Sequence, residues 1–334
     1  TSMSVMNLYL GHRLGLWRSM VDAGPVTSGQ LASRTGYDER YLREWLDAMT
    51  VNGYIEHEEG TGAFSVPSEH AAALTDRDNP AFVAPFLCWL PGLAGVLKPL
   101  RGAFKTGGGV PYEAYGTHTL EAIGTGNRSM FVNDYVSSWI PALPDVEAKL
   151  QEGARVADIG CGLGWSSISL AKGFPASAID AYDLDVASIE KAEALAEQEG
   201  VEERVRFHVA AAEDIVTLNK YDLVTAFEVI HDMAYPVEAL KRMREMLAPG
   251  GVVLIADEAV GDTLEENSDF YGRFMYNFSV LHCLPQAKVF QNSAETGTVM
   301  GPAKLREYAE RAGFSKVEVL PIENDFWRFY RLEP

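Results

Sequence analysis

The stretch Asp158-Ile159-Gly160-Cys161-Gly162-Leu163-Gly164 decides the fold. It joins a short apolar segment, residues 154–159, to a segment of helical character, residues 165–173. Glycines at such a junction let the backbone turn tightly and let a ligand approach without meeting a Cβ atom. In a doubly wound sheet this turn lines the ligand-binding crevice. The stretch therefore predicts a ligand site at the start of an α/β domain.

The spacing of the glycines indicates which ligand this is. Trp165 stands where a dinucleotide fingerprint has its third glycine. Asp158, at the end of the first strand, would repel a pyrophosphate but can attract a ligand that has an ammonium group. Asp183 ends the second strand, where an acid can accept hydrogen bonds from both ribose hydroxyls. These features favour S-adenosylmethionine, which has an ammonium group and no phosphate. A nicotinamide dehydrogenase and a turn without any ligand are the alternatives.

Beyond this turn, apolar segments alternate with helical ones, which predicts a parallel sheet with helices on both faces. Helices are expected at 186–200, 236–251 and 302–313. The expected strands are 154–160, 177–183, 204–210, 221–227, 250–257, 316–322 and 326–333. The fold class is therefore α/β, with a doubly wound, Rossmann-like sheet.

The N-terminal region has the pattern of a winged helix. Apolar residues from Val5 to Met20 recur at helical spacing and predict one helix that ends at Gly24-Pro25. Thr27 and Asp38 are expected N-caps of two further short helices, and residues 53–67 alternate like a two-stranded wing. We expect a winged-helix dimerisation domain at 1–80, a helical connector and substrate cover at 81–150, and the ligand-binding domain at 151–334.

Charge and cysteine content bear on partners and location. The 334-residue chain has a net charge of −19, and residues 1–78 hold six arginines, no lysine and eleven acids. We therefore expect no nucleic-acid partner, although a ligand-sensing winged-helix regulator remains an alternative. Three distant cysteines, without a C-x-x-C pair, predict neither disulfides nor a thiolate zinc site and fit the cytoplasm. The apolar run at 81–97 is too short to span a bilayer, so no membrane association is expected.

Residues 154–258 resemble class I S-adenosylmethionine-dependent methyltransferases. The resemblance rests on the glycine stretch, on Asp183 and on the order of the elements. With the winged-helix region, the chain resembles the dimeric small-molecule O-methyltransferases. This resemblance implies a homodimer through the N-terminal domain, a small-molecule acceptor, and S-adenosylhomocysteine as product. Ala211 departs from the pattern, because many family members have an acid there.

Several residues are expected to bind the cofactor. Leu184 would lie against the adenine face, and Glu213 and Asp214 would meet the adenine edge. The full predicted set is Asp158, Gly160, Gly162, Gly164, Asp183, Leu184, Glu213, Asp214 and Phe227. No carboxylate cluster resembles that of the metal-dependent catechol enzymes, so we predict no metal.

His231 and Glu258 are the predicted catalytic residues. They follow the fourth and fifth strands, whose carboxyl ends share one rim of a parallel sheet. A phenol with a pKa near ~10 needs a base, and a histidine suits that role. Glu258 would orient the imidazole. The family resemblance agrees, because plant-type O-methyltransferases have a His-Asp-Trp segment, here His231-Asp232-Met233. A second flanking carboxylate has no clear equivalent near residues 295–301. The alternative is that His231 only caps its strand.

Two aromatic stripes are expected to form the acceptor chamber, since their residues recur every four positions on predicted helices. Core packing is the alternative. The stripes suggest an apolar or aromatic acceptor with a hydroxyl group; carbon or nitrogen acceptors, and a relative that no longer transfers methyl, remain open. The predicted substrate-binding residues are Phe131, Tyr135, Trp139, Tyr271, Phe274 and Phe278.

Overall fold

The computed structural model describes residues 2–334 and divides into two compact units. The first unit comprises residues 1–92 and 117–129, and the second comprises residues 93–116 and 130–334. Each unit has a hydrophobic core of its own. No helix within the described residues is long and apolar enough to cross a bilayer.

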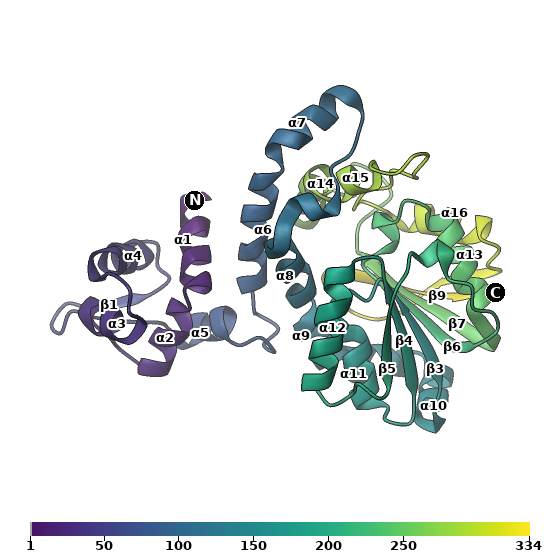
Figure 1. Cartoon of the computed structure of the whole chain (residues 1–334), viewed down its shortest axis with the longest axis horizontal. Helices are drawn as coiled ribbons and strands as arrows, with labels where there is room; N and C mark the ends of the chain where they lie inside the picture. The colour runs from purple at the N-terminus through teal and green to yellow at the C-terminus, as the bar shows by residue number, and fades with distance from the viewer. Residues whose placement is uncertain (1) are drawn as a thin grey trace. The chain divides into compact units, whose positions relative to one another are not determined.

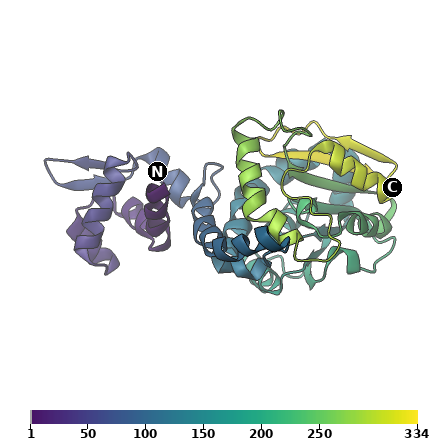
Figure 2. The same cartoon turned by 90° about the horizontal axis from the view of Figure 1, so that it is seen from above.

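The first unit is a winged helix followed by helices of the connecting region. Its hairpin projects beyond its helices (Figure 2). The elements are α1 (Ser2–Arg13), α2 (Leu16–Ala23), α3 (Ser28–Thr35), α4 (Glu39–Val51), β1 (Glu56–Glu58), β2 (Ala63–Ser65) and α5 (Ser68–Thr75), then α6 (Ala84–Gly95), α8 (Gly116–Gly126) and α9 (Arg128–Met130). The expected winged helix is confirmed.

Local chemistry explains where these helices begin and end. The Thr27 hydroxyl accepts from the Gln30 amide, while the Gln30 side chain accepts from the Thr27 amide, which forms the expected capping box of α3. Asp38 caps α4 by accepting from the Tyr41 amide. The single helix expected up to Gly24 is wrong. Gly15 adopts a left-handed conformation (φ 66°) and separates α1 from α2.

The second unit is built on a seven-stranded sheet, most of whose strands can be followed in Figure 1. Its order is β5-β4-β3-β6-β7-β9-β8; pairs from β5 to β7 are parallel, and β9 runs antiparallel to both neighbours. The strands are β3 (Arg155–Ile159), β4 (Ala178–Asp183), β5 (Val205–Val209), β6 (Tyr221–Phe227), β7 (Leu247–Glu258), β8 (Lys316–Val319) and β9 (Trp327–Glu333). The expected α/β class is confirmed.

Helices connect and cover these strands. Helices α13 and α16 pack together and help to bury one face of the sheet, which carries Ile159, Val224 and Ile255. The regular helices are α7 (Leu97–Thr106), α10 (Pro144–Glu152), α11 (Trp165–Gly173), α12 (Val186–Gln198), α13 (Pro236–Met246), α14 (Phe270–Leu281), α15 (Cys283–Ala287) and α16 (Pro302–Arg311). Short turns are η1 (Tyr112–Tyr115), η3 (Ile140–Ala142), η4 (Ala212–Asp214) and η5 (Ile230–Asp232).

The chain order of the strands reverses beside β3. From β3 the chain goes outward through β4 and β5, then returns to place β6 on the other side of β3. Connections that leave in opposite directions open a crevice at the carboxyl ends of the two central strands. The glycine turn follows β3, and the His231 segment follows β6, so both lie at this crevice.

The helix expected around Phe131, Tyr135 and Trp139 is a π-helix, η2 (Phe131–Trp139). Its wider hydrogen bonding is seen at its end, where the Ile140 amide donates to the carbonyl of Tyr135. π-Helical turns are uncommon and are frequent at functional sites.

Candidate active site

The glycine turn is tied to the neighbouring strand by backbone hydrogen bonds. The amides of Gly160 and Cys161 both donate to the Tyr182 carbonyl, at 2.8 and 3.0 Å. The Gly162 amide donates to the carboxylate of Asp183 at 2.8 Å. The turn and the end of β4 therefore form one rigid structure.

Glycine is required in this turn for two different reasons. Gly162 has φ 52°, and a Cβ atom placed there would meet no atom within 4 Å, so its outer side faces open space. Gly164 has φ 78°, and a Cβ atom there would lie 2.8 Å from the Phe207 ring. One glycine thus leaves room for a ligand, and the other permits close packing against β5.

Asp158 lies beneath the turn and is only 2% exposed. Its carboxylate accepts hydrogen bonds from the hydroxyls of Ser166, Ser167 and Thr225 at 2.5, 2.7 and 2.8 Å. Burial raises the pKa of Asp158, and these hydroxyl groups oppose that rise. Asp158 therefore holds the turn, α11 and β6 together from below.

The other predicted cofactor residues end or follow neighbouring strands of the sheet, and Asp183 contacts the turn directly. Asp183 accepts from the amides of Gly162 and Asp185, and each carboxylate oxygen retains accepting capacity for a ligand. Leu184 is 59% exposed beside it. Glu213 and Asp214 lie in η4, between β5 and β6. Burial raises the pKa of Asp183, and the two amide donors oppose this.

His231 is paired with a carboxylate, but that carboxylate belongs to Asp257. The Nδ1 atom of His231 lies 2.6 Å from Oδ1 of Asp257, and both residues are almost fully buried. Because a carboxylate only accepts, Nδ1 carries a proton, and Nε2 is the atom that can accept another. Nε2 lies 3.4 Å from Asp232.

The expected contact between His231 and Glu258 is wrong, and strand geometry explains why. Successive side chains of a strand point to opposite faces of the sheet. Asp257 shares its face with Ile255, which belongs to the core beneath α13 and α16, as does Ile230 next to His231. Glu258 points to the other side, and no hydrogen bond or ion pair joins it to His231 within residues 2–334.

The charges around His231 set its protonation state. Burial alone would lower the pKa of the imidazole, but the carboxylates of Asp257 and Asp232 outweigh it and raise the pKa well above its usual value. Two carboxylate oxygens around this imidazole, Oδ2 of Asp257 and Oδ1 of Asp232, are buried and have no hydrogen-bond partner among the described residues. The two carboxylates therefore favour the protonated form of the His231 imidazole.

Glu258 is in contact with Tyr271 of α14, whose hydroxyl donates to its carboxylate. Burial and the nearby Glu228 raise the pKa of Glu258 well above its usual value, which favours the protonated carboxyl. Glu228 itself has a left-handed backbone (φ 54°) just after β6, and its amide donates to Ala256 of β7. Non-glycine residues rarely adopt this conformation, and when they do they are often at functional sites.

The two aromatic stripes differ in their surroundings. Phe131, Tyr135 and Trp139 are buried, and their ring centroids lie 5.3, 5.1 and 6.1 Å from that of Phe227 at the end of β6. They join the π-helix to the sheet next to the crevice. Their burial is compatible with core packing as well as with the back wall of a chamber.

The second stripe is more open. Phe274 is 39% exposed, and its ring centroid lies 5.8 Å from that of Phe278, which in turn lies 5.5 Å from His282. Tyr115 and Tyr112 contact the same His282 ring, at 4.8 and 6.3 Å between centroids. These rings form a continuous aromatic cluster within the second unit, in which Tyr115 and His282 are buried and Phe274 is partly exposed.

Sequence reasoning missed several residues of this region. Tyr112 lies close enough to Asp183 and Asp232 that both carboxylates, together with burial, raise the pKa of its hydroxyl. A single tyrosine in a glycine-rich stretch gives no signal of this placement. Cys283 offers its thiol within 4.8 Å of His231 and Asp232. Asp257 was missed because two adjacent acids end its strand, and the alternation of side chains does not by itself show which of them faces His231.

The His231–Asp257 pair gives a test that does not depend on any substrate. We expect Asp257→Asn to lower the pKa of His231 by about one unit or more, because an opposite charge is lost. Glu258→Gln should change it much less, because Glu258 is bonded to Tyr271 and makes no hydrogen bond or ion pair with His231 among the described residues. Histidine-selective NMR titration, with the His231 signal identified by its loss in His231→Gln, measures both. Equal shifts in the two variants would contradict the assigned pairing.

Comparison with known proteins agrees with this architecture. Residues 2–76 match a family model described as an Rv2258c-like winged HTH domain, and residues 150–313 match one described as a methyltransferase domain. An acetylserotonin O-methyltransferase from Mus musculus molossinus is 27% identical over 71% of this chain and 65% of its own length. A ubiquinone biosynthesis O-methyltransferase from Caulobacter sp. is 35% identical over 31% of this chain. This chain spans less than half the length of the first curated relatives that it matches.

Solved structures share the fold over nearly the whole chain. An O-methyltransferase family protein from Burkholderia thailandensis superposes with a TM-score of 0.72 at 14% identity, covering 99% of this chain and 94% of that one. PigF with S-adenosylhomocysteine gives 0.74 at 17%, covering 99% and 96%. NcsB1, an O-methyltransferase from neocarzinostatin biosynthesis, gives 0.66 at 20%, covering 99% and 95%. The chain therefore consists of a winged HTH domain at residues 2–76 and a methyltransferase domain at residues 150–313, and it shares the fold of these O-methyltransferase structures.

Proposed function

We propose that the protein transfers a methyl group from S-adenosylmethionine to a hydroxyl group of a small aromatic metabolite. The observation that carries the proposal is the buried His231–Asp257 pair, 2.6 Å apart, beside the glycine turn. The two features are linked directly, because a Cβ atom on Gly160 would lie 2.5 Å from the side chain of Val229, two residues before His231.

The residues at the crevice fit this cofactor. The open side of Gly162 leaves room for an adenosyl group, Asp183 can accept from its ribose hydroxyls, and the exposed Leu184 can lie against the adenine. The carboxylates near the turn suit a cationic ligand without phosphate. When bound, S-adenosylmethionine supplies a methyl group that is already activated on a sulfonium.

His231 moves the proton in this proposal. Asp257 holds the Nδ1 proton, so the neutral ring presents Nε2 as the acceptor of the hydroxyl proton. The raised pKa of His231 means that the neutral form grows only as pH rises. We infer that a sulfonium nearby lowers this pKa and favours the neutral base, because like charges oppose one another.

The proposed acceptor is aromatic. Phe274 and Phe278 offer aromatic faces on which a flat ring can stack, and the buried rings of His282 and Tyr115 pack behind them. We keep Phe131, Tyr135 and Trp139 as the proposed back wall, and Tyr271 as a polar contact. The molecules named for two similar proteins support an aromatic acceptor. One relative is an acetylserotonin O-methyltransferase, and NcsB1 was solved in complex with 1,4-dihydroxy-2-naphthoic acid.

We also propose that the protein acts in the cytoplasm as a homodimer through residues 1–80. Its three cysteines are free and buried, which fits a reducing compartment. Helix α1 exposes Met3, Met6 and Leu10 on one face, at 75%, 50% and 45%. An apolar face of this kind suits a second copy of the same helix.

Cofactor recognition is tested with the neighbouring acids Asp183 and Asp185. We expect Asp183→Asn to weaken S-adenosylhomocysteine binding about tenfold or more, because an acceptor for the ribose hydroxyls loses its charge. Asp185→Asn is the matched control, since Asp185 caps α12 through the Ser188 amide. Isothermal titration calorimetry measures both. Binding of NAD in place of the product would contradict the cofactor assignment.

Catalysis is tested with labelled S-adenosylmethionine and a panel of phenols and naphthols. We expect His231→Ala to lower kcat about 10²–10⁴-fold, with the affinity for the cofactor product unchanged. In the unchanged protein, kcat/KM should rise with pH through the raised pKa of His231, and this rise should be absent in the variant.

The outcomes separate the alternatives. Turnover retained within severalfold in His231→Ala would remove the base role and point to a carbon or nitrogen acceptor that reacts without a base. Binding of the cofactor without turnover on any acceptor, together with salt-dependent DNA binding, would support the regulator.

The dimer is tested by light scattering. We expect a mass about twice the 36.6 kDa of the chain, and expect Met6→Glu combined with Leu10→Glu to reduce it to the mass of one chain, because charges on the apolar face oppose its burial. Val51→Glu, at an 84% exposed site on α4, is the control. A single-chain mass for the unchanged protein would contradict the proposal.

A further inference from the structure

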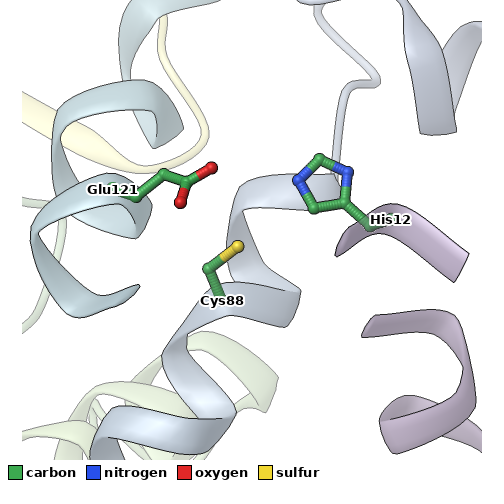
Figure 3. Close-up of side chains that lie close together, drawn as sticks. All are labelled: His12, Cys88 and Glu121. Carbon is green, nitrogen blue, oxygen red and sulfur yellow. The ribbon is translucent and has the colours of Figure 1, made fainter. Parts of the chain in front are cut away.

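Three potential metal ligands meet in the first unit, far from one another in sequence. His12 lies on α1, Cys88 on α6 and Glu121 on α8. One ligand atom from each lies within 4.8 Å of the other two. Figure 3 shows the imidazole, the thiol and the carboxylate directed toward a common space. No sequence motif signals this cluster, because its members are separated by dozens of residues.

The ligand atoms of this cluster are largely uncommitted. Within residues 2–334, neither the His12 imidazole nor the Cys88 thiol has a hydrogen-bond or ion-pair partner. Cys88 is fully buried. Glu121 uses Oε2 for the Arg13 guanidinium at 2.7 Å, which leaves Oε1 available. A nitrogen, a sulfur and an oxygen donor therefore face one another without satisfying one another.

We propose that His12, Cys88 and Glu121 bind a Zn²⁺ ion, with water as the fourth ligand. Zinc accepts imidazole nitrogen, thiolate sulfur and carboxylate oxygen in tetrahedral geometry. At metal–ligand distances of about 2.0–2.3 Å, tetrahedral ligands lie roughly 3.5 Å apart. The ligand atoms, which lie within 4.8 Å of one another, reach that distance by rotation of the side chains. Binding displaces the proton of the Cys88 thiol to solvent, since the thiolate is the ligand.

Such an ion would join three helices that the chain connects only through long segments. It would pin α1 to α6 and α8, the helices that follow the winged helix. Arg13 opposes binding of the ion. Its guanidinium is already paired with the Glu121 carboxylate, and its positive charge repels a cation. The second cluster of metal-ligand residues, His231, Asp232 and Cys283, belongs to the proposed catalytic site and serves as an internal comparison.

Cobalt(II) is the probe for this site, because its bond to a thiolate absorbs near the ultraviolet. We expect the full-length protein to bind one equivalent with a thiolate band, and expect Zn²⁺ to displace it. Cys88→Ser should abolish the band, while Cys283→Ser should retain it. His12→Gln and Glu121→Gln should weaken binding at least about tenfold. Arg13→Gln should tighten binding severalfold, which a purely structural cluster would not produce.

Folding of the variants is checked separately by circular dichroism without metal. Zn²⁺ should raise the Tm of the unchanged protein and of Cys283→Ser, but not that of Cys88→Ser, because an ion bound only by the folded state stabilises it. Absence of a thiolate band in the unchanged protein would overturn the proposal. A band that persists in a folded Cys88→Ser but disappears in Cys283→Ser would also overturn it, and would assign the metal to the other cluster. Methyl transfer is not needed for any of these measurements.

Discussion

The hydrogen bonds between the glycine turn and β4 are the constraint on which the site depends. Two amides of the turn donate to the Tyr182 carbonyl, and a third donates to Asp183. These bonds require left-handed backbone at the glycines, so the turn cannot relax toward an ordinary strand-to-helix loop. They also bring the acid expected to bind ribose next to the open side of Gly162. Because β6 lies beside β3, the same turn is adjacent to the segment that carries His231.

Buried charge explains why this crevice suits a cation. Asp158, Asp257 and Glu258 are each about 98–99% buried and lie at or near the carboxyl ends of β3 and β7, the two strands that flank β6. Asp158 accepts hydrogen bonds from hydroxyl groups, Asp257 is paired with the His231 imidazole, and Glu258 accepts from the Tyr271 hydroxyl. A phosphate brought to this rim would meet carboxylates, whereas a sulfonium would be attracted to them. The acidic composition of the whole chain acts in the same direction.

The sequence predicted what local chemistry determines and missed what depends on distant packing. Strand ends, the glycine turn and the cap at Thr27 were identified because each is encoded within a few residues. The choice between Asp257 and Glu258 depends on which face of β7 meets His231, and adjacent acids leave that choice open. Gly15 lies within the single helix that the apolar spacing predicts, but its left-handed backbone separates α1 from α2. The approach of His12, Cys88 and Glu121 arises entirely from tertiary structure.

The end of β7 shows how one strand can support two parts of a catalytic site. Asp257 faces the His231 segment, and Glu258 faces Tyr271 on α14, because neighbouring residues of a strand point to opposite sides. The amides of that strand are held by the sheet, so neither side chain can move without disturbing the other. Helix α14 also carries Phe274 and Phe278 of the aromatic cluster. The position of the proposed base and the position of the proposed acceptor wall are therefore set by two consecutive residues.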